Sequence, residues 1–130
     1  MIIDSQLLNK VSEQARQNDR LRMNFNFHLK GEAPSQRLLN ALEPGTQVPV
    51  HRHQHTGESY ILLRGKMRVY FHNDQGDVTE TFELDPLNGQ FGVEIPLGQW
   101  HSLEVLETGT VIFEAKDGPY APISPEDVLN

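Results

Sequence analysis

Short runs in which apolar and polar residues alternate follow one another from residue 22 to residue 116, and a turn containing glycine or proline closes nearly every run. In the first run, Met23, Phe25 and Phe27 alternate with polar residues. Alternation sends successive side chains to opposite faces of a strand, and many short strands joined by such turns are typical of a sandwich or barrel. The sequence therefore predicts an all-β fold, with further strands expected at 37–42, 47–53, 59–64, 66–72, 77–84, 91–94, 101–107 and 111–116.

The segment before these runs has a different period. Its apolar residues are spaced as on one face of a helix, at Leu7, Leu8, Val11 and Ala15. Asp4 or Ser5 can serve as the N-cap. A length of 130 residues suits one domain with one core. We expect a single domain over 1–130, with the N-terminal helix in 1–20, a barrel in 22–116 and a proline-rich tail in 117–130.

Charge and composition exclude several classes of function. The chain has 11 Lys and Arg against 18 Asp and Glu, a formal net charge of −7, which argues against binding to nucleic acid or to an anionic membrane surface. It has no cysteine, so thiolate metal sites and thiol nucleophiles are excluded. No apolar run approaches the roughly 20 residues of a membrane helix. The N-terminus lacks the pattern of a secretory signal, so we expect a cytoplasmic protein.

Metal-ligating residue types gather in the middle of the chain. His51 and His53 are two residues apart, so on a strand they project to the same face. A turn follows, and Glu58 begins the returning strand, which predicts a site of two histidines and one carboxylate for a divalent ion. His101 follows a rigid turn that begins at Pro96, and we predict it as a fourth ligand.

Two stretches carry a resemblance to a known family. The first has the spacing Gly45, His51, His53, Glu58 and Gly65; the second is Pro96, Gly98 and His101. These stretches resemble the two cupin motifs, and over nearly the whole chain the sequence is similar to the WbuC-type cupin metalloproteins, small bacterial proteins linked to O-antigen and surface-polysaccharide clusters. The resemblance implies a double-stranded β-helix, a jelly-roll barrel, with a metal at its centre. It implies no defined reaction, because this fold hosts many chemistries.

Further residues are candidates for catalysis. Tyr60 shares the face of Glu58 and is either a phenol offered to substrate or a core residue. Glu94 precedes the turn at Pro96 and is either a general base or a solvent-facing strand residue. His55 is expected at the pocket mouth or in solvent.

A second group of candidates lies on one face of the first strand. Its members are Arg22, Asn24, Asn26 and His28. This face is either solvated or a polar wall of the barrel interior, where it would suit a hydroxyl-rich or carboxylate-bearing ligand.

The edges of the sheets suggest how copies of the chain associate. Arg64, Lys66 and Arg68 are predicted to form a solvated cationic edge, which discourages strand pairing. The N-terminal helix and the proline-rich tail can cross to a partner subunit, so we expect a homodimer.

Three functions are compatible with this site. Imidazole and carboxylate ligands suit Fe(II), Mn(II), Ni(II) or Zn(II). The leading hypothesis is a metal-dependent cupin that acts on a small polar substrate, as a sugar or nucleotide-sugar isomerase or epimerase of surface-polysaccharide synthesis. The alternatives are an Fe(II)-dependent dioxygenase and a noncatalytic sugar- or metabolite-binding cupin.

Overall fold

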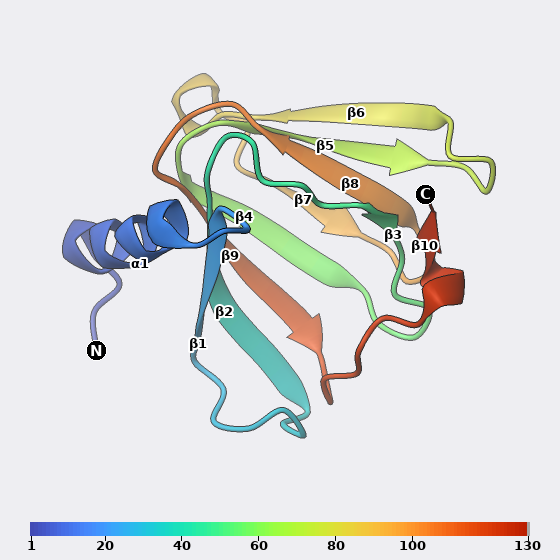
Figure 1. Ribbon diagram of the computed structural model, residues 1–130, viewed down its shortest axis with the longest axis horizontal. Helices are drawn as coiled ribbons and strands as arrows, with labels where there is room; N and C mark the ends of the chain where they lie inside the picture. Colours follow the sequence, from blue (N-terminus) through green and yellow to red (C-terminus); the bar gives the residue numbers. More distant parts are fainter. Residues whose placement is uncertain (130) are drawn as a thin grey trace.

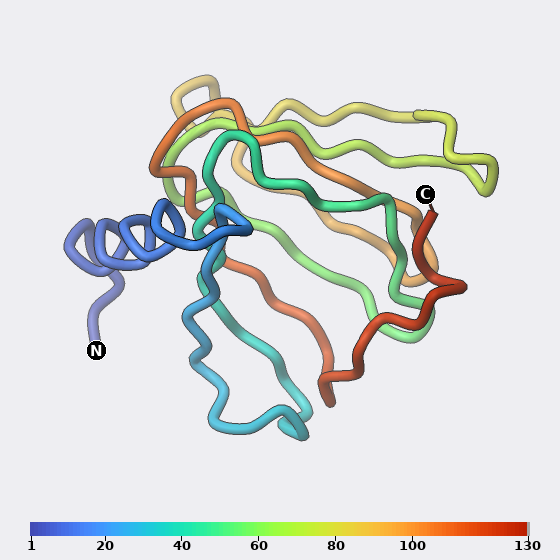
Figure 2. The backbone as a smooth tube through the Cα atoms, in the orientation of Figure 1, coloured from blue at the N-terminus to red at the C-terminus, as the bar shows by residue number. Residues whose placement is uncertain are grey.

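Two antiparallel five-stranded sheets face each other in the computed structural model, which describes residues 1–129 (Figures 1 and 2). The strand order is β1-β2-β9-β4-β7 in the first sheet and β10-β3-β8-β5-β6 in the second. Most neighbours are distant in the sequence, so the chain passes repeatedly between the sheets, as in a jelly roll. The predicted all-β fold with one short N-terminal helix is confirmed. The elements are α1 (Ser5–Gln17), β1 (Arg22–Asn26), β2 (Ser35–Leu42), β3 (Val50–His51), β4 (Glu58–Arg64), β5 (Met67–His72), β6 (Val78–Leu84), η1 (Pro86–Asn88), β7 (Gly92–Ile95), β8 (Trp100–Val105), β9 (Thr110–Asp117), η2 (Pro125–Asp127) and β10 (Val128–Leu129).

The helix α1 covers the outer face of the first sheet. Asp4 caps it by accepting a hydrogen bond from the backbone N–H of Leu7 at 3.0 Å. Its buried apolar residues pack against β2 and β9; the cluster comprises Leu8, Val11, Ala15, Leu39, Ala41 and Val111. A helix of 13 residues is marginal alone, so this apolar contact supplies most of its stability.

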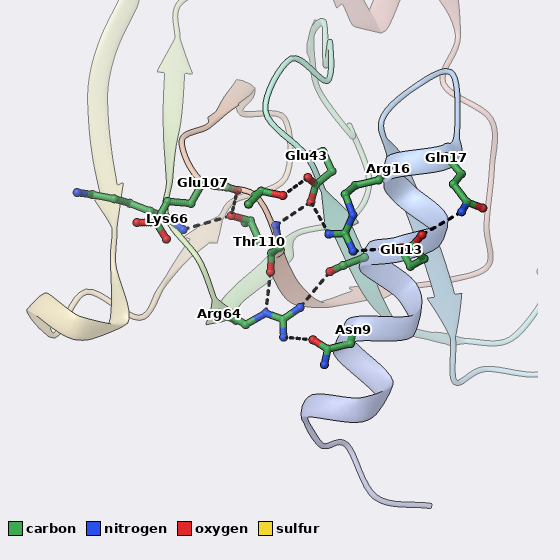
Figure 3. Close-up of polar contacts among 12 residues, drawn as sticks. Asn9, Glu13, Arg16, Gln17, Glu43, Arg64, Lys66, Glu107 and Thr110 are labelled. Atoms are coloured by element: carbon green, nitrogen blue, oxygen red, sulfur yellow. Dashed lines mark hydrogen bonds and ion pairs between the residues drawn. The ribbon is translucent and has the colours of Figure 1, made fainter.

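Arg64 fastens the helix to the sheet (Figure 3). Its guanidinium donates hydrogen bonds to Asn9 Oδ1 at 2.6 Å, to Ser12 Oγ at 3.1 Å and to the backbone carbonyl of Gly109 at 2.8 Å. The prediction that Arg64 belongs to a solvated edge is therefore wrong. The side chain is half-buried, and its N–H groups donate hydrogen bonds to other parts of the protein.

The orientation of β1 decides between the two interpretations of its polar face. Met23, Phe25 and Phe27 pack with the helix on the outer side of the sheet. The alternate residues of the strand, Arg22 and Asn24, consequently point toward the space between the two sheets. The polar face is thus an inner wall, and it is not covered by the apolar core.

The strand that carries His51 is shorter than expected. The sequence predicts a strand over 47–53, whereas β3 contains only Val50 and His51. Pro49 has no backbone N–H to give to a ladder, so it ends the strand on that side. Along one edge β3 pairs with β10, and Val128 lies opposite His51. The sequence did not predict this pairing.

Within residues 1–129, no helix combines the length and the apolar content needed to cross a bilayer.

Candidate metal centre

Three histidines, one on β3, one on β8 and one in the segment after β3, meet between the sheets. β3 pairs with β8 in a register that sets His51 directly opposite His101. His53 follows two residues after His51, and one ring nitrogen from each of the three lies within 4.8 Å of the others. The ring centroids of His51 and His101 are 4.2 Å apart. This group can hold a metal ion.

Backbone carbonyls orient two of these rings. The Nδ1 atom of His51 lies 2.8 Å from the carbonyl oxygen of Pro49, and that of His101 lies 2.9 Å from the carbonyl oxygen of Gln99. A carbonyl only accepts, so in both rings Nδ1 carries the proton and Nε2 presents a lone pair. The hydrogen bond from Nδ1 to the backbone thus fixes the tautomer in which Nε2 can bind a metal.

Glu58 brings the carboxylate to the same place. Its Oε1 atom lies 2.6 Å from His53 Nε2 and 3.8 Å from Lys116 Nζ, while Oε2 lies 3.9 Å from His101 Nε2. The side chain is only 3% exposed. The structure therefore brings together all four predicted ligands: His51, His53, Glu58 and His101.

Two buried atoms at this point have no hydrogen-bond partner, Glu58 Oε2 and His101 Nε2. Buried polar atoms are nearly always paired, so two orphans that face each other need an explanation. A divalent cation bound between them would satisfy both. The donor set fits such an ion, because imidazole nitrogens with one carboxylate oxygen suit Fe(II), Mn(II), Ni(II) and Zn(II).

The protonation states agree with ligation. Burial, with the nearby His51, lowers the pKa of His101 to about 4, and burial also lowers the pKa of His51. Burial alone would raise the pKa of Glu58, but the hydrogen bond and charge of His53, together with His101 and Lys116, outweigh it and lower the pKa to about 2. Near neutral pH, His51 and His101 are neutral and Glu58 is ionised, which are the forms that bind metals.

A central cavity of about 310 Å³ is lined by three of the four predicted ligands, His51, His53 and Glu58. Tyr60 lines it, with its ring centroid 6.4 Å from that of His101. Burial, reinforced by the charges of Glu58 and Glu114, raises the pKa of Tyr60 well above its ordinary value, so the phenol stays protonated. Arg22 and Asn24 line the same cavity.

Asn26 and His28 line a side cavity of about 390 Å³. The two cavities share Asn24, Glu114, Lys116 and Tyr120, so they adjoin. The four polar residues predicted on this strand thus divide between the two spaces.

Glu94 does not join the site. It is exposed on β7, where it accepts a hydrogen bond from Ser59 Oγ at 2.6 Å. Ser59 lies between Glu58 and Tyr60 on β4 and so points to the opposite face of the sheet. The structure therefore offers Glu94 no path to the cavity as a general base. His55 is exposed, as expected.

Sequence reasoning missed Glu114, a carboxyl that lines both cavities. It is buried on β9 opposite Tyr60, and its Oε1 atom accepts a hydrogen bond from Asn40 Nδ2 at 2.9 Å. Burial, with the charge of Glu58, raises the pKa of Glu114 to about 7. The available signal was its spacing: Glu114 is two residues from Ile112, a core residue, and hence on the same face of the strand.

Comparison with known proteins places this chain in a family. The family described as a domain of unknown function, DUF6016, matches residues 3–84. The chain belongs to DUF6016. This DUF6016 member is also similar to mouse protocadherin Fat 4, with 35% identity over 75 residues that make up 58% of the chain and 1% of that protein.

Solved structures show the fold of this DUF6016 member. The cupin domain of Cnp3 from Schizosaccharomyces pombe is 15% identical, with a TM-score of 0.59, over 74% of this chain and 64% of that chain. The capsular polysaccharide assembling protein CapF from Staphylococcus aureus is 22% identical, with a TM-score of 0.65, over 85% of this chain and 30% of that chain. CapF has also been solved with the inhibitor 3-isopropenyl-tropolone. These likenesses establish a cupin fold, and the chain spans about a third of CapF.

Proposed function

We propose that the protein is a metal-dependent cupin enzyme that isomerises or epimerises a sugar or nucleotide sugar in surface-polysaccharide synthesis, as expected for a WbuC-type cupin. The observation that carries the proposal is the pair of orphaned buried atoms, Glu58 Oε2 and His101 Nε2, beside two further imidazoles and an open polar cavity. The fold likeness to CapF, a capsular polysaccharide assembling protein, supports a sugar as the substrate. A cytoplasmic location and a homodimer belong to the same proposal.

A metal bound by His51, His53, Glu58 and His101 would polarise a substrate carbonyl or enediolate oxygen. Side chains that line the cavity would move the proton and donate hydrogen bonds to the substrate. Isomerisation moves a proton from one carbon to its neighbour, so it needs a group that takes the proton and returns it. Glu114 lies in the cavity wall outside the predicted ligand set, and Tyr60 beside it can donate a hydrogen bond to a substrate oxygen.

Metal content tests the first half of the proposal. Purified protein should contain about one divalent ion per chain, and a His51→Ala, His53→Ala double variant should contain none. His55→Ala is the matched control, because this exposed histidine lies outside the cluster, and it should keep the parent's metal. Metal-free parent protein, or equal metal in parent and double variant, would refute the centre.

Proton transfer tests the second half. When a panel of nucleotide sugars is incubated with the loaded protein in deuterated water, one sugar should gain solvent deuterium at a carbon next to a carbonyl or former carbonyl. The double histidine variant should leave every sugar unlabelled. A product that forms only in the presence of O₂ would indicate the dioxygenase instead, and binding without any exchange or product would indicate a noncatalytic cupin.

A further inference from the structure

Two arginines separated by one residue lie at the start of β1. Arg20 and Arg22 both line the central cavity that holds the metal ligands. Both also line an adjoining cavity of about 330 Å³, which we call the arginine cavity. Its other walls come from Asn18, Met23, Asn24 and Asn40.

The charge at this place is unbalanced. No residue that lines the arginine cavity is acidic, although the chain as a whole carries a net charge of −7. Within residues 1–129, neither Arg20 nor Arg22 forms an ion pair, whereas Arg16, Arg52 and Arg68 each pair with a carboxylate. Two neighbouring cations without a counter-ion form a site of positive potential in an acidic protein.

Arg22 is held in place by neutral acceptors. Its Nη1 atom donates to the carbonyl oxygen of Gln47 at 2.7 Å and to Thr46 Oγ1 at 3.5 Å, and Thr46 Oγ1 itself donates to the carbonyl oxygen of Arg20 at 2.6 Å. Nε and Nη2 of Arg22 make no hydrogen bond to the described residues. Burial, with the charge of Arg20 as a lesser cause, lowers the pKa of Arg22, as expected for a cation that has lost water without gaining an anion.

The backbone between the two arginines is strained. Leu21 has φ +57°, and it is the one residue other than glycine with a positive φ among the described residues. Its N–H donates to the carbonyl of Asn18 at 2.9 Å and its carbonyl accepts from the N–H of Glu43 at 2.9 Å, so the kink is fixed from both sides. A left-handed conformation is unfavourable for a leucine, and such strain is concentrated at functional sites.

We propose that Arg20 and Arg22 bind an oxyanion of the substrate, a phosphate or a carboxylate, while the metal centre holds neighbouring oxygens of the same molecule. The planar guanidinium presents paired N–H groups that match both anions. The link to the metal centre rests on the proposed function. The substrate class narrows accordingly to sugar phosphates, nucleotide sugars and uronates, and neutral sugars are excluded.

Inorganic phosphate is the first probe, because it reports on the anion site without turnover. Calorimetric titration should show binding to the parent protein, and an Arg20→Gln, Arg22→Gln double variant should bind at least about ten-fold more weakly, as expected for the loss of charged hydrogen bonds. Arg37→Gln is the matched control. Arg37 is an exposed arginine of β2 that lines neither the central nor the arginine cavity, and its replacement should leave the affinity unchanged.

Titrations with further ligands and with the histidine variant distinguish binding by the arginines from binding by the metal. Galactose 1-phosphate and galacturonate should each bind more weakly to the double arginine variant, and neutral galactose should be unaffected. The affinities of the parent for these two ligands distinguish a phosphate site from a carboxylate site. The His51→Ala, His53→Ala variant should still bind inorganic phosphate. Phosphate that binds to the arginine variant but not to the histidine variant sits on the metal, and this result would overturn the proposal, as would a parent that binds no anion.

Metal analysis of the same proteins keeps the two proposals apart. The double arginine variant should retain the parent's metal content. A parent without metal that still binds phosphate through Arg20 and Arg22 would refute the metal-dependent enzyme and leave the anion site standing.

Discussion

The space between the two sheets has two ends that differ in kind, although the same strands build both. On β4, Glu58 and Tyr60 point into the cavity end, and Leu62, two residues further, points into the apolar core. On β8, His101 is at the cavity end and Val105 is in the core. One end holds the unpaired polar groups of the site, and the other is packed with leucine, valine, methionine and isoleucine.

This difference shows how a small sandwich can tolerate a site whose buried polar atoms have no hydrogen-bond partners. The closed end contributes apolar burial, which is the dominant favourable contribution to folding. The open end carries buried polar atoms without partners, at Asn40, Glu58 and His101, and these oppose folding. Substitutions at the closed end should therefore destabilise the protein, whereas removal of a buried charge from the open end should stabilise it.

The largest effect is expected at Gly65, in the turn between β4 and β5 at the closed end. Gly65 has φ +96°, and a Cβ atom there would lie 2.6 Å from the Cα of Thr110. Thr110 cannot retreat, because it is fully buried and its hydroxyl bonds both the N–H of Lys66 and the carbonyl of Glu107 (Figure 3). Gly65→Ala should lower the free energy of unfolding by about 4 kcal/mol, the sum of left-handed strain and overpacking, as measured by urea denaturation.

Gly98, in the turn before β8 at the cavity end, is the matched control. It has φ +77°, but no atom lies within 4 Å of the place that its Cβ would take. Gly98→Ala should cost only the conformational strain, about 1 kcal/mol. Equal losses at the two glycines would show that the closed end is no more tightly packed than the open one.

The next effect concerns pH and has the opposite sign. The pKa of Glu114, about 7 in the folded protein, exceeds its ordinary value of 4.5, so folding favours the protonated form. Its contribution to stability is complete below about pH 4.5 and is lost as the pH rises through about 7. In metal-free protein at pH 8, Glu114→Gln should therefore be more stable than the parent by about 3 kcal/mol, with nearly equal stabilities at pH 4.5.

Urea denaturation in a chelating buffer across this pH range checks the prediction. Parent and variant should diverge steadily above pH 5. Parallel curves would mean that Glu114 is already ionised without penalty in the folded protein.

The smallest effect is expected at Asn40, which supports Glu114. Asn40→Ala removes the 2.9 Å hydrogen bond to Glu114 and should cost about 1 kcal/mol, as measured by thermal unfolding. Asn24→Ala, at an exposed asparagine of the same cavity, should change the stability by less than about 0.5 kcal/mol. A larger loss at Asn24 than at Asn40 would mean that the polar wall, and not the buried pair, stabilises the open end.

The features that could be predicted from the sequence were those with a local signal. Alternation and turns predicted an all-β sandwich or barrel. The spacing of His51, His53 and Glu58 predicted that they converge, because two-residue spacing fixes the face of a strand. His101 could be predicted as a ligand only from the motif that begins at Pro96, because its pairing opposite His51 joins residues that are far apart in the sequence.

The remaining features depended on which face of a strand points inward. The polar face of Arg22 and Asn24 resembles a solvated surface in sequence, and it lines a cavity because the helix covers the other face. Glu94 stands near the second motif but is adjacent to the buried Ile95, so its side chain points outward. Glu114 resembles a surface carboxylate until its pairing opposite Tyr60 is known.

The two-residue strand β3 makes the candidate metal centre a late product of chain synthesis. His51 is flanked on one side by β8 and on the other by β10, so the wall that holds it joins residues 51, 101 and 128. A nascent chain that has emerged only as far as Glu58 carries three of the four ligands and none of the framework that aligns them. Binding of an ion by all four residues would therefore require that β8 and β10 have been synthesised and have paired with β3.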